Sequence, residues 1–392
     1  MKNLTRTVWI LSLVSLFTDM ASEMLYPVMP VYLKSVGFSI ALIGILEGVA
    51  EATAGLSKGY FGALSDRAGK RVPFVQAGYA LSAISKPMMA LFVFPVWIFL
   101  ARAIDRLGKG IRTGARDALL SEEATPETKG SVFGFHRSMD TFGAVLGPLL
   151  ALLYLYFYPN DYKTLFFLAF IPGFLAILSS LYLKDKKAVN IVQKQRLPFF
   201  SFITYWKTSP VLYRRLVAGL LAFALFNSSD IFLLLKAKET GLGDTTVIGI
   251  YIFYNLVYAL TAYPLGVMAD RIGLKRMFIA GLSVFALVYI GMSFVNNLYA
   301  LMLFFLLYGV YAAATEGISK AWISNITKKQ DTATAIGTYS GFQSVCAMLA
   351  SALTGLIWHA WGAGVALQMT GFATAITVLY LAFFVKSSHS QA

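Results

Sequence analysis

Ionisable side chains lie inside stretches of the sequence that are otherwise apolar. Asp19 and Glu23 are four residues apart in the stretch 8–33, and Glu51 lies in the stretch 40–62. In a helix this spacing places Asp19 and Glu23 on one face. A charge at the centre of a bilayer costs roughly 2.5 to 3.5 kcal/mol, so such residues are rare unless they face a cavity or a partner. Carboxyl groups in this setting can bind and release a proton; a structural contact with neighbouring helices is the alternative.

The stretch 96–119 is dense in basic residues. Counting the helical rise places Asp105 and Arg106 about 15 Å inside the span. A buried arginine stays charged, so Arg106 holds a nearby carboxylate ionised until a substrate or a proton competes for it. Arg112 and Arg116 lie closer to the end of the stretch, where we expect their side chains to extend toward the surface.

His136 and Asp140 lie one helical turn apart in the stretch 131–157. Histidine titrates in the physiological range, so the two side chains can pass a proton, although a histidine satisfied by its neighbours is the alternative. The candidates for proton coupling are therefore Asp19, Glu23, Glu51, Asp105, Arg106, His136 and Asp140.

The composition is that of an all-α integral membrane protein. Of 392 residues, 58% are hydrophobic and 13% are charged, against about 25% charged in soluble domains. The net charge of +14 does not indicate nucleic-acid binding, because Lys and Arg cluster between apolar segments. Twelve membrane spans are predicted, at 8–33, 40–62, 73–93, 96–119, 131–157, 163–183, 213–236, 246–268, 277–295, 299–323, 334–358 and 365–385.

The spans divide into two halves of six helices. Residues 1–183 form the first half, 184–212 a basic linker close to lipid headgroups, and 213–392 the second half. The distribution of Lys and Arg predicts that both termini lie in the cytoplasm. We expect a monomeric protein of the cell (inner) membrane.

A short motif occurs twice, 204 residues apart, each time between two spans. We expect the aspartate of each copy to accept hydrogen bonds from backbone N–H groups or a helix N-terminus. Two such loops at corresponding places in two halves indicate a duplicated membrane transporter, in which we expect these loops to serve gating. Gly110, Gly130, Gly134 and Phe135 also recur, at an offset of 207, as Gly317, Gly337, Gly341 and Phe342. The gating-loop residues are Gly62, Asp66, Arg67, Gly69 and Arg71 in the first copy, and Gly266, Asp270, Arg271, Gly273 and Arg276 in the second.

With these two loops the chain resembles the major facilitator superfamily over its whole length. The resemblance implies twelve helices in two pseudo-repeats, with a small-molecule site near the bilayer midplane and alternating access. Arg106-x-x-Lys109-Gly110 resembles the superfamily's helix 4 motif Arg-x-x-Gln-Gly, whose arginine is associated with proton coupling; here Lys109 replaces the glutamine.

Glycines in the fifth span resemble a motif of the superfamily's exporters, without the Gly-Gly pair that usually follows. We expect them to let this helix pack closely on a helix of the other half, with a bend at Gly-Pro. The motif comprises Gly134, Gly143, Gly147 and Pro148. The resemblance thus favours proton-coupled export.

The second half has few buried charges, which indicates an apolar and aromatic wall for the substrate. The cavity candidates are Tyr26, Arg102, Lys109, Phe226, Asn227, Tyr254, Tyr258, Glu316 and Gln343.

Three other functions are weighed against proton-coupled export. Arg102, Arg106 and Lys109 on one helix would suit uptake of an anion. Soft ligands at Met20, Met24, His136 and Met139 would suit a metal carrier. A membrane enzyme or receptor without transport is not expected, because the sequence contains no paired nucleophile and base, no metal-ligand cluster and no appended soluble domain. No nucleotide-binding loop is found, so ATP is not the expected energy source, and no cofactor is predicted.

Overall fold

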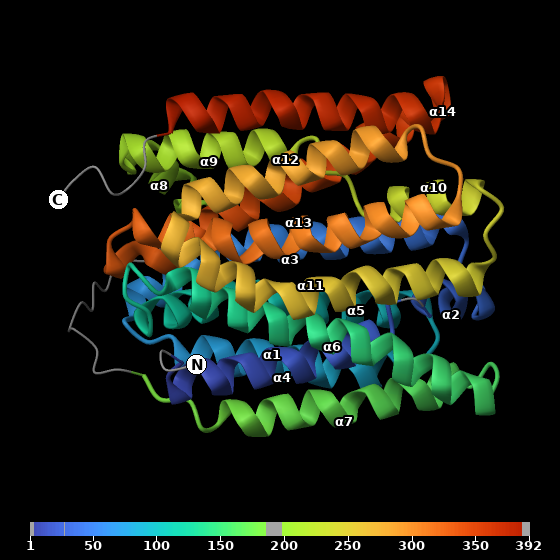
Figure 1. Ribbon diagram of the computed structural model, residues 1–392. Coiled ribbons are helices and arrows are strands. Elements are labelled where there is room, and N and C mark those ends of the chain that lie inside the picture. Colours follow the sequence, from blue (N-terminus) through green and yellow to red (C-terminus); the bar gives the residue numbers. More distant parts are fainter. Residues whose placement is uncertain (1–3, 27, 186–197, 386–392) are drawn as a thin grey trace. The chain divides into compact units, whose positions relative to one another are not determined.

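The computed structural model describes residues 4–26, 28–185 and 198–385, and these residues are predominantly helical (Figure 1). This confirms the predicted all-α class. In chain order the helices are α1 (Arg6–Glu23), α2 (Met29–Ser35), α3 (Ile40–Ala68), α4 (Val72–Leu91), α5 (Pro95–Glu122), α6 (Lys129–Phe157), α7 (Tyr162–Ser180), α8 (Ser201–Thr208), α9 (Val211–Ala224), α10 (Ile231–Glu239), α11 (Asp244–Ile272), α12 (Leu274–Met292), α13 (Leu298–Asn325), the short 3-10 helix η1 (Lys329–Asp331) and α14 (Thr332–Phe384).

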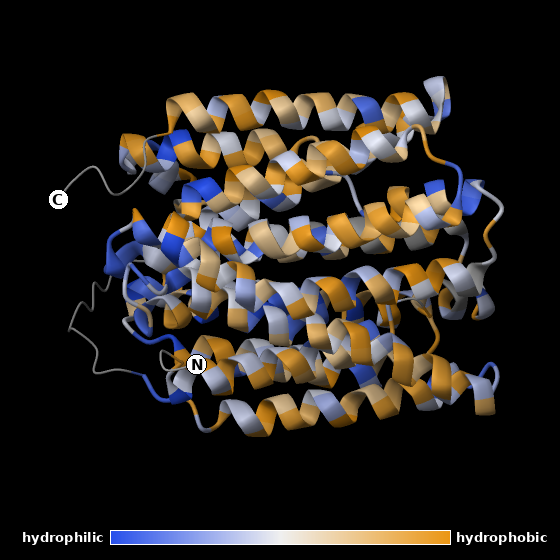
Figure 2. Cartoon of the chain, in the orientation of Figure 1, coloured by the Kyte–Doolittle hydropathy of each residue, from blue (hydrophilic) through white to orange (hydrophobic). Residues whose placement is uncertain are grey.

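Each predicted span has a helical counterpart. Among the described residues, the helices long and apolar enough to cross a membrane, by length and composition alone, are Lys129–Phe157, Tyr162–Ser180, Thr246–Ile272, Leu274–Met292, Leu298–Asn325 and Lys329–Phe384. The last contains two predicted spans, which meet at a kink where Gly362 has φ 86° and ψ 166°. Hydrophobic residues predominate along the helices, and hydrophilic residues gather toward helix ends (Figure 2).

Two predicted spans are broken helices. The span 8–33 contains α1 and α2, and the span 213–236 contains α9 and α10. The second break holds the sequence Asn227-Ser228-Ser229-Asp230. Side chains of these types hydrogen-bond to nearby backbone groups and so compete with helix formation; here the Ser229 hydroxyl accepts a hydrogen bond from the backbone N–H of Ile231 at 3.4 Å.

The chain forms two compact units, which are described separately. Unit 1 comprises residues 1–123, 139–207 and 328–341, and unit 2 comprises 124–138, 208–327 and 342–392. The start of α14 therefore belongs to unit 1, and the start of α6 to unit 2. The division into halves with a linker at 184–212 stays a prediction; linker residues 186–197 lie outside the described residues, and α8 lies within the remainder.

Candidate functional site

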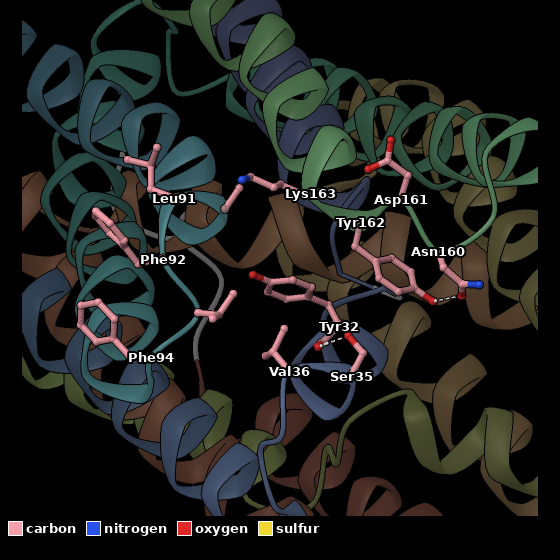
Figure 3. Close-up of a pocket in the computed structure, with 12 residues that line it drawn as sticks. Tyr32, Ser35, Val36, Leu91, Phe92, Phe94, Asn160, Asp161, Tyr162 and Lys163 are labelled. Carbon is pink, nitrogen blue, oxygen red and sulfur yellow. Dashed lines mark hydrogen bonds between the residues drawn. The ribbon is translucent and has the colours of Figure 1, made fainter.

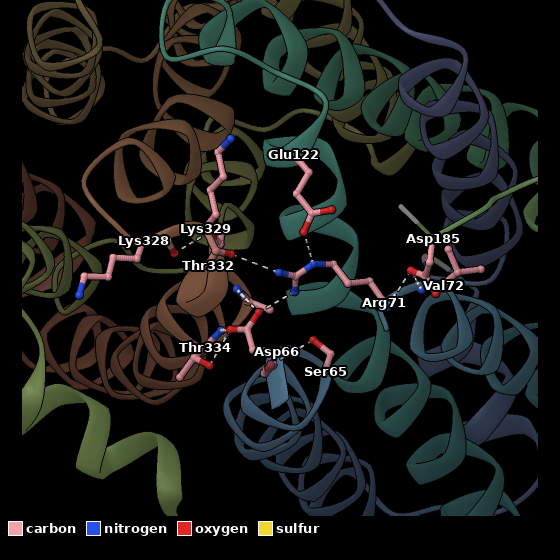
Figure 4. Close-up of polar contacts among 12 residues, drawn as sticks. Ser65, Asp66, Arg71, Val72, Glu122, Asp185, Lys328, Lys329, Thr332 and Thr334 are labelled. Carbon is pink, nitrogen blue, oxygen red and sulfur yellow. Dashed lines mark hydrogen bonds and ion pairs between the residues drawn. The ribbon is translucent and has the colours of Figure 1, made fainter. Parts of the chain in front are cut away.

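Asp66, at the end of α3 in unit 1, accepts hydrogen bonds from the first turn of α14 (Figure 4). The donors are the backbone N–H of Ala333, at 3.3 Å, and the backbone N–H and hydroxyl of Thr334, at 2.6 and 2.7 Å. A helix N-terminus carries partial positive charge and unsatisfied N–H groups, which suit a carboxylate. The hydrogen bonding expected for this aspartate is confirmed.

Arg71 forms ion pairs with this carboxylate and with a second acid, at the end of α5 (Figure 4). Its guanidinium contacts Asp66 at 2.6 Å and Glu122, at the end of α5, at 2.5 Å. The backbone N–H groups of Arg71 and Val72 both donate to Asp185, at 2.9 and 3.0 Å. These contacts hold the loop between α3 and α4 in one conformation.

Asp270, the counterpart of Asp66 in unit 2, makes the same kind of contact at the end of α11. It accepts the backbone N–H groups of Gly130 and Ser131, in the first turn of α6, at 2.7 and 2.8 Å. The turn glycines also correspond, since Gly69 and Gly273 have φ values of 61° and 99°. The basic residues differ: Arg71 is buried, whereas Arg276 is exposed.

Small residues let the helices pack closely beside both aspartates, Asp66 and Asp270. In unit 1, α14 passes so close to α3 that a methyl group on Gly337 would overlap the carbonyl oxygen of Lys58. In unit 2, a methyl group on Gly134 of α6 would lie 2.6 Å from the carbonyl oxygen of Ala262 in α11. By these contacts Gly134 corresponds to Gly337, an offset of 203 rather than 207. The difference is about one helical turn, and it arises because small residues repeat every four positions along this face.

The helix against which the exporter-like glycines of α6 pack is not the one predicted for most of them. A methyl group on Gly147 would lie 2.6 Å from the carbonyl oxygen of Met20, and one on Gly143 would lie even closer to the carbonyl oxygen of Leu16. Both glycines therefore pack on α1 of the same predicted half. Only Gly134 packs on a helix of the other predicted half. Pro148 lies inside α6.

A buried ion pair in unit 1 was missed by the sequence analysis. Lys86 of α4 contacts Asp105 of α5 at 2.7 Å, and their side chains are 2% and 9% exposed. Arg102 contacts the other oxygen of Asp105 at 3.6 Å. The sequence signal was available, because Lys86 is a charged residue inside the apolar span 73–93.

Arg112 and Arg116 are buried, with 5% and 8% exposure, so the expected extension toward the surface is wrong. Arg112 lies over the ring of Tyr79, 4.6 Å from its centroid. Arg116 contacts Asp117 at 2.9 Å and donates to the Ser15 hydroxyl of α1 at 3.3 Å. Counting depth along α5 ignored the helices α1 and α4 packed against it.

Several predicted coupling residues lie within one electrostatic network in unit 1. Glu51 interacts electrostatically with Lys109 and Arg106, and Lys109 also interacts with Asp19. Asp19 and Glu51 are half-buried and Lys109 is exposed. Acids from α1 and α3 therefore share the basic side chains of α5.

The remaining acids and the histidine of the predicted set are distributed over α1 and α6. Glu23 is half-buried one turn after Asp19 on α1. His136 and Asp140 are buried on α6, in unit 2 and unit 1 respectively, and Asp140 interacts electrostatically with Arg116.

In unit 2, Arg137 joins two of the predicted cavity residues. Its guanidinium contacts Glu316 of α13 at 2.9 Å and donates to the Tyr258 hydroxyl of α11 at 2.6 Å. The amide of Asn227 donates to the Tyr311 hydroxyl at 3.3 Å. Of the other candidates, Tyr26 and Phe226 are exposed, Gln343 is half-buried and Tyr254 is buried.

A cavity of about 460 Å³ lies at one end of unit 1, away from these residues (Figure 3). It is lined by α2, the end of α4 and the loop before α7, including Tyr32, Phe92 and Lys163. At its rim, hydrogen bonds from Tyr154 and Thr164 hold the pKa of the Asp161 carboxyl below its usual range. None of the predicted site residues lines this cavity. Within the described part of the chain, no group of three or more His, Cys, Asp or Glu side chains could hold a metal ion.

The sequence model described as the Major Facilitator Superfamily matches residues 11–253 and 231–392. An uncharacterised MFS-type transporter of Methanocaldococcus jannaschii is 31% identical over 363 residues, which are 91% of this chain and 89% of that protein. The multidrug resistance protein MdtG of Enterobacter lignolyticus is 26% identical over 324 residues, covering 80% and 76% of the two chains.

Two solved structures share the fold. The human organic anion transporter MFSD10 superimposes with a TM-score of 0.77 at 16% identity, covering 96% of this chain and 99% of that one. The fucose:proton symporter FucP of E. coli superimposes with a TM-score of 0.78 at 12% identity, covering 97% and 99%.

Proposed function

We propose, from the premise that this chain belongs to the major facilitator superfamily and is a membrane transporter, that it exports a small organic solute in exchange for protons. Alternating access would move the solute across the cell (inner) membrane, with both termini in the cytoplasm and the protein acting as a monomer.

The observation that carries proton coupling is the network around Lys109 in unit 1. Asp19 and Glu51 are half-buried carboxyl groups from apolar helices, and both interact electrostatically with this one lysine. Binding a proton on either acid would remove its attraction to Lys109, and so change the balance of charge in the network. Such a change is what couples a proton to a conformational step.

Two observations support export. The glycine motif in α6 resembles that of the superfamily's exporters, and relatives at low identity are named multidrug resistance proteins. The solute is therefore proposed to leave the cell, as a proton enters.

The experiment uses everted membrane vesicles that hold a pH gradient, with ethidium as the probe. Ethidium addition should dissipate the gradient with the unchanged protein. The Asp19→Asn variant should lose that response while still exchanging ethidium across the membrane. Glu239→Gln, an exposed acid in α10, is the matched control. If Asp19→Asn responds like the unchanged protein, Asp19 is not the coupling residue, and Glu51 and Asp140 are tested next.

Uptake of an anion is a second candidate, favoured by the exposed Lys109 beside Arg106 on α5. Counterflow with the solute loaded on one side of the vesicle distinguishes it from export, because only an anion carrier would accumulate an anionic probe.

A further inference from the structure

Asp230 is an acidic residue that the sequence analysis did not select as a site residue. It lies at the break between α9 and α10, inside the predicted span 213–236, and is half-buried. Its carboxylate accepts hydrogen bonds from the hydroxyl of Tyr254 in α11 and from the hydroxyl of Ser229, the latter at 3.3 Å. The tyrosine therefore fixes the position of the carboxylate.

The charge environment of Asp230 differs from that of the other paired acids. Asp105, Asp117 and Glu316 each contact a lysine or arginine within 3 Å. Among the described residues, no lysine, arginine or histidine forms an ion pair with Asp230. An acid inside a membrane span without a cationic partner is costly, and a bound ligand or a proton can supply the missing positive charge.

The tyrosine that donates to this carboxylate, Tyr254, belongs to a cluster of aromatic rings. The ring centroid of Tyr254 lies 5.5 Å from that of Tyr251 and 5.3 Å from that of Tyr308. Tyr251 is half-buried, so part of the cluster is accessible. The face of an aromatic ring carries negative potential and attracts cations, most strongly where water is excluded. A carboxylate beside such rings matches a positively charged nitrogen or phosphorus centre.

We propose that Asp230 and the rings of Tyr251 and Tyr254 bind the cationic group of the transported solute, which is thus an organic cation. This rests on the proposed function, since it names the substrate class of the transporter. In unit 1, acidic side chains form ion pairs with basic ones, as Asp105 does with Lys86. The negative charge of Asp230 would instead be compensated by the positive charge of the bound solute.

Equilibrium dialysis of the purified full-length protein with tetraphenylphosphonium tests the proposal without any proton gradient. The unchanged protein should bind the cation, and Asp230→Asn should weaken the affinity about tenfold or more. Asp230→Glu keeps the charge and should retain most of the binding, which separates lost charge from a folding defect. Glu239→Gln, at an exposed acid at the other end of α10, should bind as the unchanged protein does.

Substitutions of Tyr254 test the proposal independently of Asp230. Tyr254→Phe keeps the ring and should bind within about threefold of the unchanged protein, whereas Tyr254→Leu should lose binding. The proposal is overturned if the unchanged protein does not bind tetraphenylphosphonium, if Asp230→Asn binds it equally well, or if the protein prefers the anion 8-anilinonaphthalene-1-sulfonate. Because no gradient is applied, these outcomes are separate from the pH-gradient test of coupling.

Discussion

Thr334 donates both its backbone N–H and its hydroxyl to one carboxylate oxygen of Asp66. The two residues join α3 to the first turn of α14, although they are 268 positions apart in the sequence. In unit 2, Asp270 accepts the backbone N–H groups of Gly130 and Ser131, whereas Asp66 also contacts the guanidinium of Arg71. The contact at Asp66 is therefore the more extensive of the two.

Asp66→Asn should reduce transport strongly while leaving folding and membrane insertion nearly intact. The amide keeps the size of the side chain but loses the charge that the α14 N-terminus and Arg71 stabilise. Transport rate and the size-exclusion profile are measured together, and Asp270→Asn should cause a smaller loss. Normal turnover in Asp66→Asn would argue against a gating role for this contact.

The contact of each aspartate with a helix N-terminus could be predicted because it depends on a local motif. An aspartate after a spanning helix and before a turn glycine needs only backbone donors, which every helix start provides. The partner helix could not be named from the motif alone. The recurrence at 207 residues identified α6 and α14 as counterparts, but small residues at every fourth position made the register ambiguous by one turn.

Depth along a single helix proved a poor guide to burial. Arg116 lies near the end of α5, yet Ser15 of α1 and Asp117 enclose it. Lys86 is the single charged residue of α4, so nothing on its own helix identifies its partner, which is Asp105 of α5. Such ion pairs depend on how the helices pack, and the residues of one helix do not reveal which neighbouring helix supplies the partner.

Lys86→Met should destabilise the protein by about 3 kcal/mol, because it leaves Asp105 buried with only the more distant Arg102 as an ion-pair partner. The double variant Lys86→Met with Asp105→Leu should recover part of that loss, since no uncompensated carboxylate remains. Thermal unfolding in detergent measures both, and Lys163→Met, at an exposed lysine, is the control. A double variant less stable than Lys86→Met would contradict this account.

Phe202→Ala should weaken the contact between α3 and α14. Phe202, in the linker helix α8, is 3% exposed, and a methyl group on Gly59 of α3 would lie 2.6 Å from its ring. Its carbonyl oxygen accepts the hydroxyl of Thr338 in α14 at 3.4 Å. We expect turnover to change more than probe affinity, because the ring supports the gating contact rather than the solute.

Ile203→Ala, at the next position on α8, is the matched control for Phe202, because Ile203 is 39% exposed. It should leave turnover and affinity unchanged. Equal effects of the two substitutions would mean that the effect does not depend on the ring of Phe202, and would contradict its proposed support of the contact between α3 and α14.

Substitutions of Arg106 test whether the basic side chains of α5 serve proton coupling or bind the solute. Arg106 interacts electrostatically with Asp105 and Glu51 in unit 1, so its charge acts on both of these acids. Arg106→Lys keeps the charge but loses the planar fork, and should retain part of the proton-driven transport, whereas Arg106→Ala should retain almost none. Affinity and turnover are both measured in vesicles with an imposed pH gradient, and turnover should fall more. A large loss of affinity with intact coupling would instead place Arg106 in contact with an anionic solute, and would favour the anion carrier over the exporter.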